Sequence, residues 1–387
     1  MATSLDLFAG AGGFTLGFQR AGIRCIGAIE IDRFASETFT FNFPHIRHFH
    51  RDIYSFTNEE IAQNFQNVDI VVGGPPCQGF SVAGPSQYGI IDKRNSLIME
   101  FFRFINILRP KVSVLENVKG ILSGKLDKTN KALETYISAL NEIGYTSKIF
   151  VLQTADFGVP QHRERVIVIS SQNPHLIPEN ILGEFKDNWI PVKDVFGDLP
   201  LIYAGEGVDS EVPYRCEPLS DYQRWIREDS KMVFNHVAMK HTKRLIERFQ
   251  HILPGCSVKD VAPEFGQRER GGADLDVKPR FKMNNQRLHP DKVSTAVTAS
   301  FQSTFVHPYL DRNLTAREGA RLQSFPDWFV FKGPRTLMSK SLLIKEGRED
   351  EIGLSQYNQI GNSVPPRMAE AIGRAVLSQL NLQANEL

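Results

Sequence analysis

The chain of 387 residues has only four cysteines, and they are far apart in the sequence. Cys25, Cys77, Cys216 and Cys256 form no C-x-x-C pair, so the sequence supports neither a zinc site nor a disulfide framework. We expect no bound metal. Cysteine usage of this kind fits a reducing cytoplasmic environment best.

Long apolar runs are also absent, so we expect no membrane partner. The start, Met1-Ala2-Thr3-Ser4, carries no basic segment and leads directly into a strand-like run, which argues against a secretory signal. Hydrophobic residues make up 41% and charged residues 23% of the chain, as in ordinary soluble globular proteins. The length allows two domains, and a monomer is the default expectation.

The sequence has little net charge, +1 at pH 7. Locally, residues 231–292 carry 13 Lys or Arg against 7 Asp or Glu. A basic excess of this size fits contact with nucleic-acid phosphates, but a solvated surface explains it slightly better when charge is considered alone. Charge therefore neither requires nor excludes a nucleic-acid partner.

Apolar runs alternate with helical patterns in the first half of the chain. Strands are predicted at residues 4–8, 25–29, 68–72, 112–115, 145–152 and 165–170, and helices at 12–21, 34–43, 97–108 and 126–143. Such alternation predicts an α/β fold with a doubly wound, mostly parallel sheet. The first domain is expected to cover residues 1–180.

The pattern becomes irregular after about residue 174, where Pro, Gly and charged residues dominate. We interpret residues 185–305 as a second, smaller and irregular domain. Helical spacing then returns at 315–323 and 366–380, so residues 306–387 are expected to rejoin the first domain. Residues 335–351 are polar and charged and are predicted to be a surface insertion.

A glycine-rich segment, Asp6 to Phe14 (DLFAGAGGF), follows the first predicted strand. Gly10 and Gly12 allow close approach of a ligand, and the helix that follows attracts anions at its N-terminus. A dinucleotide fingerprint requires a third glycine where this chain has Thr15, so a smaller anion such as a carboxylate also fits. Glu30, after the second strand, can accept hydrogen bonds from ribose hydroxyls, and Asp52 can accept one from an adenine amino group.

The segment GGPPCQGFS places Cys77 after two prolines at the end of a predicted buried strand. Ligands of open α/β sheets bind at this edge, and prolines restrict the backbone that carries the sulfur. A free cysteine is also commonly an inert core residue. The local sequence favours a reactive thiol, and the Gly- and Ser-rich residues 79–95 behind it can form a substrate-covering lid.

Glu116 ends the next predicted strand, so we expect its carboxylate to face the same edge as Cys77 and to transfer protons. In Pro160 to Arg165 (PQHRER), alternation along an extended strand would send Gln161, Arg163 and Arg165 to one face. These arginines can orient a base, a phosphate or Glu116. Structural ion pairs on a charged edge strand are the alternative.

In order, these motifs resemble those of the bacterial-type cytosine-5 DNA methyltransferases. The resemblance is carried by residues 6–18, 73–81, 115–120, 157–165, 314–327 (LTAREGARLQSFPD) and 359–366 (QIGNSVPP), and it covers most of the chain outside 180–300. It implies a Rossmann-like methyltransferase sheet, a target-recognition domain at 185–305, and a last helix folded back beside the first strand. The function implied is methylation of cytosine C5 in double-stranded DNA with S-adenosyl-L-methionine, by base flipping.

The same resemblance assigns roles to single residues. Cys77 would be the nucleophile, Glu116 would contact ring nitrogen N3, and Arg163 and Arg165 would assist. Residues lining the S-adenosylmethionine pocket would be Phe8, Ala9, Gly10, Gly12, Glu30, Ile31, Asp52, Ile53, Pro75, Leu97, Asn362 and Val364. DNA contacts are expected from Ser81, Gln161, Arg268, Arg270, Lys282 and Thr298.

Three other functions remain open from the sequence. A transfer-RNA cytosine-5 methyltransferase would use the same chemistry, although the long stretch between Arg165 and Leu314 favours duplex DNA. A catalytically silent DNA-binding module is disfavoured by the intact Cys77, Glu116 and arginine set. A nicotinamide-dependent oxidoreductase is disfavoured by Thr15 and the Pro-Pro-Cys motif. A restriction-modification role, with a separate cognate endonuclease, is the biological setting expected.

Overall fold

The computed structural model describes residues 1–76, 97–124, 131–266, 284–335 and 340–384 of the chain. The chain forms two compact units. Unit 1 comprises Met1–Gly158, Arg163–Lys186 and Ser363–Leu387, and unit 2 comprises Val159–His162 and Asp187–Asn362. Each unit has its own core and is described separately below.

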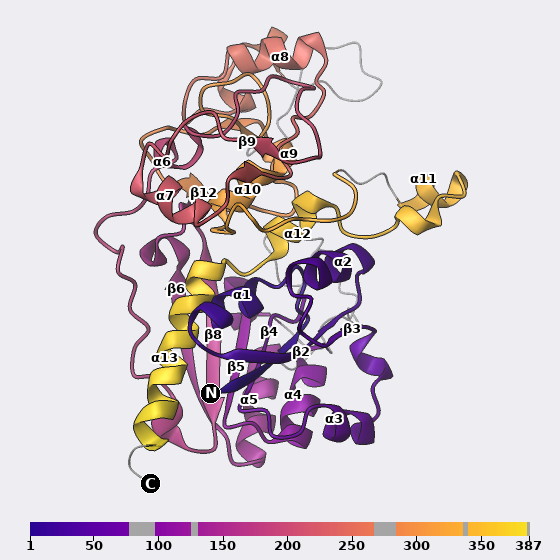
Figure 1. The fold of residues 1–387 in the computed structure, drawn as a ribbon, viewed down its shortest axis with the longest axis vertical. Helices are drawn as coiled ribbons and strands as arrows, with labels where there is room; N and C mark the ends of the chain where they lie inside the picture. Colours follow the sequence, from indigo (N-terminus) through magenta and orange to yellow (C-terminus); the bar gives the residue numbers. More distant parts are fainter. Residues whose placement is uncertain (77–96, 125–130, 267–283, 336–339, 385–387) are drawn as a thin grey trace. The chain divides into compact units, whose positions relative to one another are not determined.

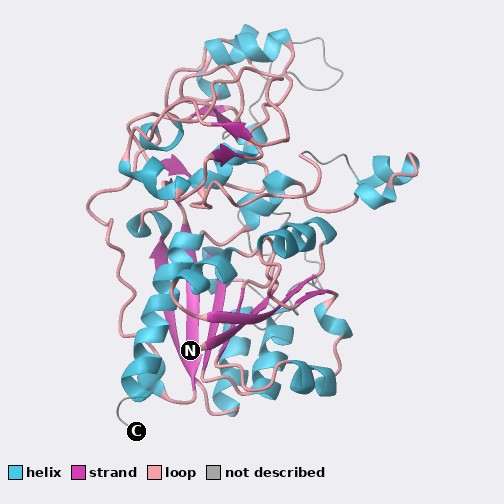
Figure 2. Ribbon diagram, viewed as in Figure 1, coloured by secondary structure: helices cyan, strands magenta, loops and turns pink. Residues whose placement is uncertain are grey.

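A seven-stranded sheet forms the centre of unit 1, with strand order β3-β2-β1-β4-β5-β8-β6 (Figures 1 and 2). The strands are β1 (Thr3–Leu7), β2 (Arg24–Glu30), β3 (His48–His50), β4 (Ile70–Gly73), β5 (Val112–Val118), β6 (Thr146–Gln153) and β8 (Glu164–Ser171). The first five run parallel, and β8 is antiparallel to both β5 and β6. The expected doubly wound, mostly parallel sheet is confirmed.

Alternation along the strands sends side chains to two separate apolar cores. Val71, Leu115 and Val168 point to one face, where helices α3, α4 and α5 cover the sheet. Val72, Val114 and Ile169 belong to the cluster on the other face, which also holds residues of α1 and α13. Both faces are buried, so these strands have continuous apolar sequences that made them predictable.

The helices of unit 1 are α1 (Gly13–Arg20), α2 (Arg33–Asn42), α3 (Asn58–Asn64), α4 (Leu97–Leu108), α5 (Ala132–Glu142) and α13 (Pro366–Ala384). Short 3₁₀ turns lie at η1 (Ile53–Ser55), η3 (Lys119–Leu122), η4 (Thr154–Phe157) and η5 (Pro174–Leu176). The chain's last helix, α13, packs along α1 (Figure 1). A Cβ on Gly17 would lie 2.5 Å from Ala369 Cβ and from the Pro366 carbonyl oxygen, so only glycine permits this approach.

Unit 2 has little regular structure, and Figure 2 shows mostly loops and short helices there. Its helices are α6 (Lys193–Phe196), α7 (Asp221–Arg227), α8 (Lys243–Gln250), α9 (Phe301–Thr304), α10 (Ala316–Leu322), α11 (Lys340–Lys345) and α12 (Gln356–Asn362), with 3₁₀ turns η6 (Val258–Asp260), η7 (Pro263–Phe265) and η8 (Glu349–Glu351). Two-residue strands form three small pairs: β9 (Val212–Pro213) with β10 (Met232–Val233), β11 (Gln286–Arg287) with β13 (Phe305–Val306), and β7 (Gln161–His162) with β12 (Ser294–Thr295).

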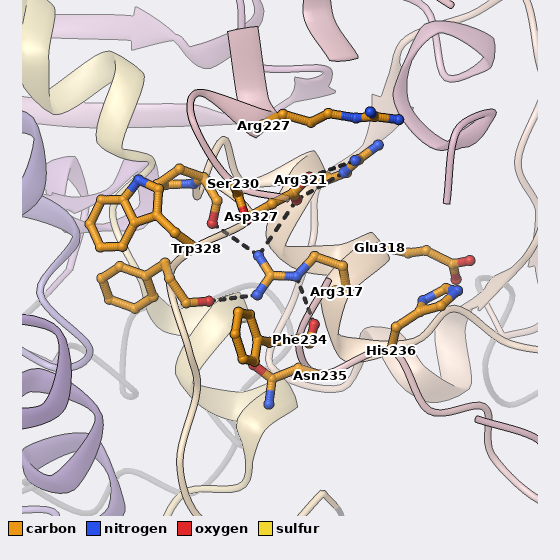
Figure 3. A network of polar contacts seen from close by, with 12 residues as sticks. Arg227, Ser230, Phe234, Asn235, His236, Arg317, Glu318, Arg321, Asp327 and Trp328 are labelled. Carbon is orange, nitrogen blue, oxygen red and sulfur yellow. Dashed lines mark hydrogen bonds and ion pairs between the residues drawn. The ribbon is translucent and has the colours of Figure 1, made fainter. Parts of the chain in front are cut away.

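Buried arginines on and near α10 organise the core of unit 2 (Figure 3). Arg321 contacts Asp198 at 2.5 Å and Asp327 at 2.6 Å, and all three side chains are fully buried. Arg317 donates to the carbonyl oxygens of Phe234, Pro326 and Phe329. This core explains a difference from the expected boundary: residues 306–362 belong to unit 2, and the chain returns to unit 1 only at Ser363.

The expected surface insertion at 335–351 contains α11 and η8, on which Leu342 and Ile344 are exposed. Leu343 is buried, so the segment is not polar throughout. Within the described parts of the chain, no helix combines the length and apolarity needed to cross a membrane.

Candidate active site

The carboxyl ends of β4 and β5 bring two of the sequence motifs together. Gly73 is the register partner of Leu115 in this parallel pair, so Gly74 lies beside Glu116. A Cβ on Gly74 would stand 2.8 Å from Glu116 Oε2. Glycine at this position therefore lets the carboxylate pack against the backbone that leads to Cys77.

Asn117 fixes the same stretch of backbone from β5. Its side chain is buried, and Nδ2 donates to the Pro75 carbonyl oxygen at 3.0 Å. The sequence analysis gave Asn117 no role; the available signal was an amide directly after Glu116 at the end of a buried strand. Cys77 and Ser81 lie outside the described residues, so Pro75 and Pro76 are the last described positions before the thiol.

Arg165 of β8 and Arg163, which directly precedes that strand, place positive charge near the Glu116 carboxylate. Arg165 Nε lies 2.8 Å from Glu116 Oε1, and both side chains are only 12% exposed. Burial raises the pKa of Glu116, and the opposing positive charges of Arg165 and Arg163 do not fully offset it. Burial also lowers the pKa values of Arg163 and Arg165, although Glu116 favours their charged forms. Burial in this cluster therefore favours the protonated form of the Glu116 carboxyl group.

The extended segment from Gln161 to Arg165 that was expected to lead into the last strand is divided between the two units. Gln161 belongs to β7 of unit 2, whereas β8 of unit 1 begins at Glu164. Gln161 is fully buried, its Nε2 donates to the Leu322 carbonyl and to Gln323, and its Oε1 accepts from Val297 N–H. A direct DNA contact by Gln161 is not supported, because this amide is committed to the core of unit 2. Nor is β8 an edge strand, since it lies between β5 and β6.

The glycine-rich segment joins β1 to α1 as a tight turn. Phe8, Gly10 and Gly12 all have positive φ, at 59°, 55° and 95°. Gly10 N–H donates to Glu30 Oε2 at 2.8 Å, and Glu30 Oε1 accepts from Asp32 N–H at 2.8 Å. Among the described residues, Gly10 and its two chain neighbours apart, no atom lies within 4 Å of the position a Cβ on Gly10 would take. A small-molecule group can approach the backbone beside a buried carboxylate.

Thr15, which replaces the third glycine of a dinucleotide fingerprint, has a defined partner. Its hydroxyl donates to Asp6 Oδ2 at 2.7 Å, and its N–H donates to the same oxygen at 3.2 Å. Asp6 thus caps a helix whose N-cap residue, Gly12, has no side chain. Burial raises the pKa of Asp6 to about 7, against the opposing hydrogen bonds from Thr15. Sequence reasoning missed this pair.

Comparison with known proteins decides the family. Residues 2–378 match the model of the C-5 cytosine-specific DNA methylases. The chain belongs to this family. It is 42% identical to the Type II methyltransferase M.DdeI of Desulfomicrobium norvegicum over 96% of this chain and 88% of that protein. It is 34% identical to the Type II methyltransferase M1.HphI of Haemophilus parahaemolyticus over 97% and 86%.

Among solved structures, a DNA modification methyltransferase encoded within an Escherichia coli prophage aligns with a TM-score of 0.74 and 26% identity, over 98% of this chain and 100% of that one. The expected DNA (cytosine-5) methyltransferase activity and the Rossmann-like methyltransferase fold are confirmed. Methylases of this family require a methyl donor and act on DNA.

The remaining residues expected around the methyl donor differ in burial and in the unit to which they belong. Asp52 Oδ1 accepts from Tyr54 N–H and caps η1, Ile53 is buried, and Ile31 is 62% exposed. Three other expected pocket residues of unit 1 are buried: Ala9, Pro75 and Val364. Leu97 is partly buried and packs against the apolar core. Asn362 ends α12 and belongs to unit 2, so it is not placed relative to the glycine turn.

The expected DNA contacts of this methylase are only partly described. Arg268, Arg270 and Lys282 lie outside the described residues. Thr298 is exposed, and a Cβ on Gly361 would collide with its carbonyl group. Asn358 Nδ2 donates to the adjoining Ala299 carbonyl at 2.8 Å. The backbone around Thr298 is therefore fixed by α12 while its side chain faces solvent.

Proposed function

We propose that this methylase transfers a methyl group from S-adenosyl-L-methionine to C5 of a cytosine flipped out of duplex DNA, with Cys77 as nucleophile. The observation that carries the proposal is the buried Glu116 carboxyl group. It lies against Gly74, three residues before Cys77, and contacts Arg165. A proton donor beside the backbone of a thiol is the arrangement that nucleophilic attack on a pyrimidine needs.

The reaction requires a bond from sulfur to the base. C5 of cytosine is a weak nucleophile, and addition of the Cys77 thiolate to C6 moves electron density onto C5. Glu116 donates a hydrogen bond or proton to N3 and so stabilises the adduct, while Arg163 and Arg165 orient Glu116. After methylation of C5, a base removes the C5 proton, and the electron pair of that C–H bond expels the thiolate from C6. A proton taken up by N3 returns to Glu116 in the same step, which regenerates the enzyme.

The glycine turn of unit 1 fits S-adenosylmethionine. Backbone N–H groups at the start of α1 suit its carboxylate, and Glu30 suits the ribose hydroxyls. Phe8, Ile31, Asp52, Ile53 and Leu97 would line its base. When bound, this donor supplies an electrophilic methyl group on a sulfonium. Thr15 at the third glycine position supports this assignment over a pyrophosphate, which would favour glycine there.

In unit 2, we propose that Arg268, Arg270, Lys282 and Thr298 contact DNA, with Ser81 of unit 1. The Type II methyltransferase relatives support a restriction-modification role, in which a separate endonuclease cuts unmethylated sites. The target sequence would be found by methylating plasmid DNA and mapping modified cytosines by bisulfite sequencing. Preferential methylation of transfer RNA over duplex DNA would overturn the choice of substrate, and binding of NAD in place of S-adenosylmethionine would overturn the donor.

The nucleophile is tested with duplex DNA that carries 5-fluorocytosine at the mapped target. Fluorine cannot leave C5 as a proton does, so the wild type should form an adduct that survives denaturing electrophoresis. Cys77→Ser should form none and should lose turnover while still binding S-adenosylmethionine. Cys216→Ser, at an exposed cysteine of unit 2, is the matched control and should trap normally. Turnover by Cys77→Ser, or an adduct mapped to another cysteine, would refute the assignment.

A further inference from the structure

Arg103 of α4 contacts the short turn η1, which begins 50 residues earlier in the chain. Its Nη2 donates to the Ile53 carbonyl oxygen at 3.1 Å, and its Nη1 donates to the Phe56 carbonyl oxygen at 2.9 Å. Nη1 also donates at 3.2 Å to Oδ1 of Asn58, the first residue of α3. One guanidinium group therefore binds the first residue of η1 and the backbone that follows the turn.

The turn has few hydrogen bonds of its own. Ser55 N–H donates to the Asp52 carbonyl oxygen at 3.0 Å, and Phe56 N–H donates to the Ile53 carbonyl oxygen at 3.4 Å. A 3₁₀ turn of three residues offers little more, and the second of these bonds is long. Arg103 thus supplies the shorter of the two bonds to the Ile53 carbonyl, and the position of η1 depends on α4.

The guanidinium group is oriented by its own helix before it reaches the turn. Glu100, one helical turn earlier, accepts from Arg103 Nε at 2.8 Å and lies 2.7 Å from Nη2. The two side chains are only 23% and 16% exposed, so water competes weakly for these charge-assisted bonds. The ion pair leaves the remaining N–H groups of Arg103 directed at the backbone of η1.

The two elements that Arg103 joins carry residues expected around the base of the methyl donor. Asp52 caps η1, and its exposed carboxylate accepts from Tyr54 N–H at 3.0 Å, so its direction follows the geometry of the turn. Ile53 is buried in the same core against which Leu97, the first residue of α4, packs. A displacement of η1 from α4 would therefore move the expected base contacts apart.

We propose that Arg103 is a positioning residue for the methyl donor, because it fixes η1 so that Asp52 can accept from the adenine amino group. The proposal rests on the proposed function, in which Asp52 and Ile53 contact that base. Arginine suits this task because its planar group donates to several acceptors in fixed directions, whereas lysine has one nitrogen. Loss of Arg103 should weaken recognition of the base and leave the methionine end of the donor, at the glycine turn, unaffected.

The test measures dissociation constants of the whole chain for three ligands by isothermal titration calorimetry. S-adenosylhomocysteine is the reference, S-inosylhomocysteine replaces the adenine amino group with a carbonyl, and 5′-methylthioadenosine lacks the amino-acid end. Arg103→Lys should bind S-adenosylhomocysteine about tenfold more weakly than the wild type, since bonds from a charged group are lost. It should also lose most of the preference for adenine over hypoxanthine. The ratio between S-adenosylhomocysteine and 5′-methylthioadenosine should not change.

Two further variants sharpen the comparison. Glu100→Gln removes the charge that orients Arg103 and should give a smaller change of the same kind. Arg109→Lys is the matched control: Arg109 follows α4 and also donates to backbone carbonyls, those of Asn106 and Ile143 at 2.9 and 3.0 Å. This control should keep all three constants. If Arg103→Lys lowered the melting temperature and weakened all three ligands equally, its role would be merely structural and the proposal overturned.

The wild type separates this inference from the function beneath it. If the wild type bound NAD but not S-adenosylhomocysteine, the proposed donor would be wrong and the positioning role would be lost with it. If it bound adenine and hypoxanthine ligands equally, Asp52 would not read the base, and the inference would again be overturned. A wild-type preference for adenine that Arg103→Lys retains in full would defeat only the positioning role.

Discussion

Unit 1 and unit 2 stabilise their interiors in different ways. In unit 1, apolar side chains fill both faces of the sheet, and the strands satisfy one another's backbone groups. In unit 2, short strands leave many backbone carbonyls without such partners, and the buried Arg287, Arg312 and Arg317 donate to them. An arginine has five N–H donors, so it can replace part of a missing hydrogen-bond ladder.

The two units also shift the pKa values of their acidic side chains in opposite directions. The acids of unit 1 at the sheet edge, Asp6, Glu30 and Glu116, are buried with too little positive charge to offset it, and their pKa values are raised. In unit 2, Glu318 and Asp327 are more completely buried than Glu30 and Glu116, but they lie against arginines, which lower their pKa values. Raised values suit groups that exchange protons or receive ligands, whereas lowered values suit permanent ion pairs.

The largest expected effect is on catalysis, which we assign to an acid of unit 1 with a raised pKa. Glu116→Gln should lower kcat by about 10²–10⁴-fold, because the amide cannot transfer a proton to the base. Its melting temperature should remain near that of the wild type. Glu164→Gln, on the same sheet but paired with the exposed Lys119, is the control and should retain its kcat. Similar rates for the two variants would remove Glu116 from the chemistry.

The next largest effect concerns the stability of unit 2. Arg321→Met should cost about 3–5 kcal/mol of unfolding free energy, because Asp198 and Asp327 would remain buried without their partner. Denaturant titration measures this loss. Arg224→Met, at a side chain that is 66% exposed and paired with Asp221, should change stability by less than about 1 kcal/mol. Equal losses from both changes would contradict the role given to the buried network.

A third prediction uses pH to distinguish the two kinds of acid. The pKa of Asp6 is raised from 3.8 to about 7, so its contribution to stability is present below pH 4 and is lost as pH rises toward 7. Relative to Asp6→Asn, the wild type should therefore become less stable across that range. Asp327 has a lowered pKa, so its contribution should be lost as pH falls below 4. The test is the difference in unfolding free energy between the wild type and Asp6→Asn, measured from pH 4 to 8. If burial does not raise the pKa of Asp6, this difference should stay constant over that range.

The smallest expected effect tests the close approach of α1 and α13. Gly17→Ala should destabilise the protein by about 1–2 kcal/mol, because overpacking against Ala369 and the Pro366 carbonyl exceeds the gain in helix propensity. Ser378→Ala on the exposed side of α13 should be neutral or slightly stabilising. Chemical denaturation of both variants measures the difference. A stabilised Gly17→Ala would mean that the two helices can move apart at little cost.

Sequence patterns predicted unit 1 better than unit 2. Strands β4, β5 and β8 are apolar because both of their faces are buried, and this pattern is readable without a structure. The short β3 (HFH) carries no such pattern and was missed, as was α3, although its Thr57–Glu60 capping box was a usable signal. The helical pattern at 315–323 was found but assigned to the wrong unit, because periodicity does not reveal which neighbours bury a helix.

By itself, the sequence determined the family and the parallel sheet, because these depend on ordered motifs and on local periodicity. Only the tertiary structure decided that Asn117 holds Pro75 and that Gln161 is a core residue. These roles depend on partners distant in the chain. A side chain's partners follow from how the whole backbone packs, and no local pattern of residues encodes that.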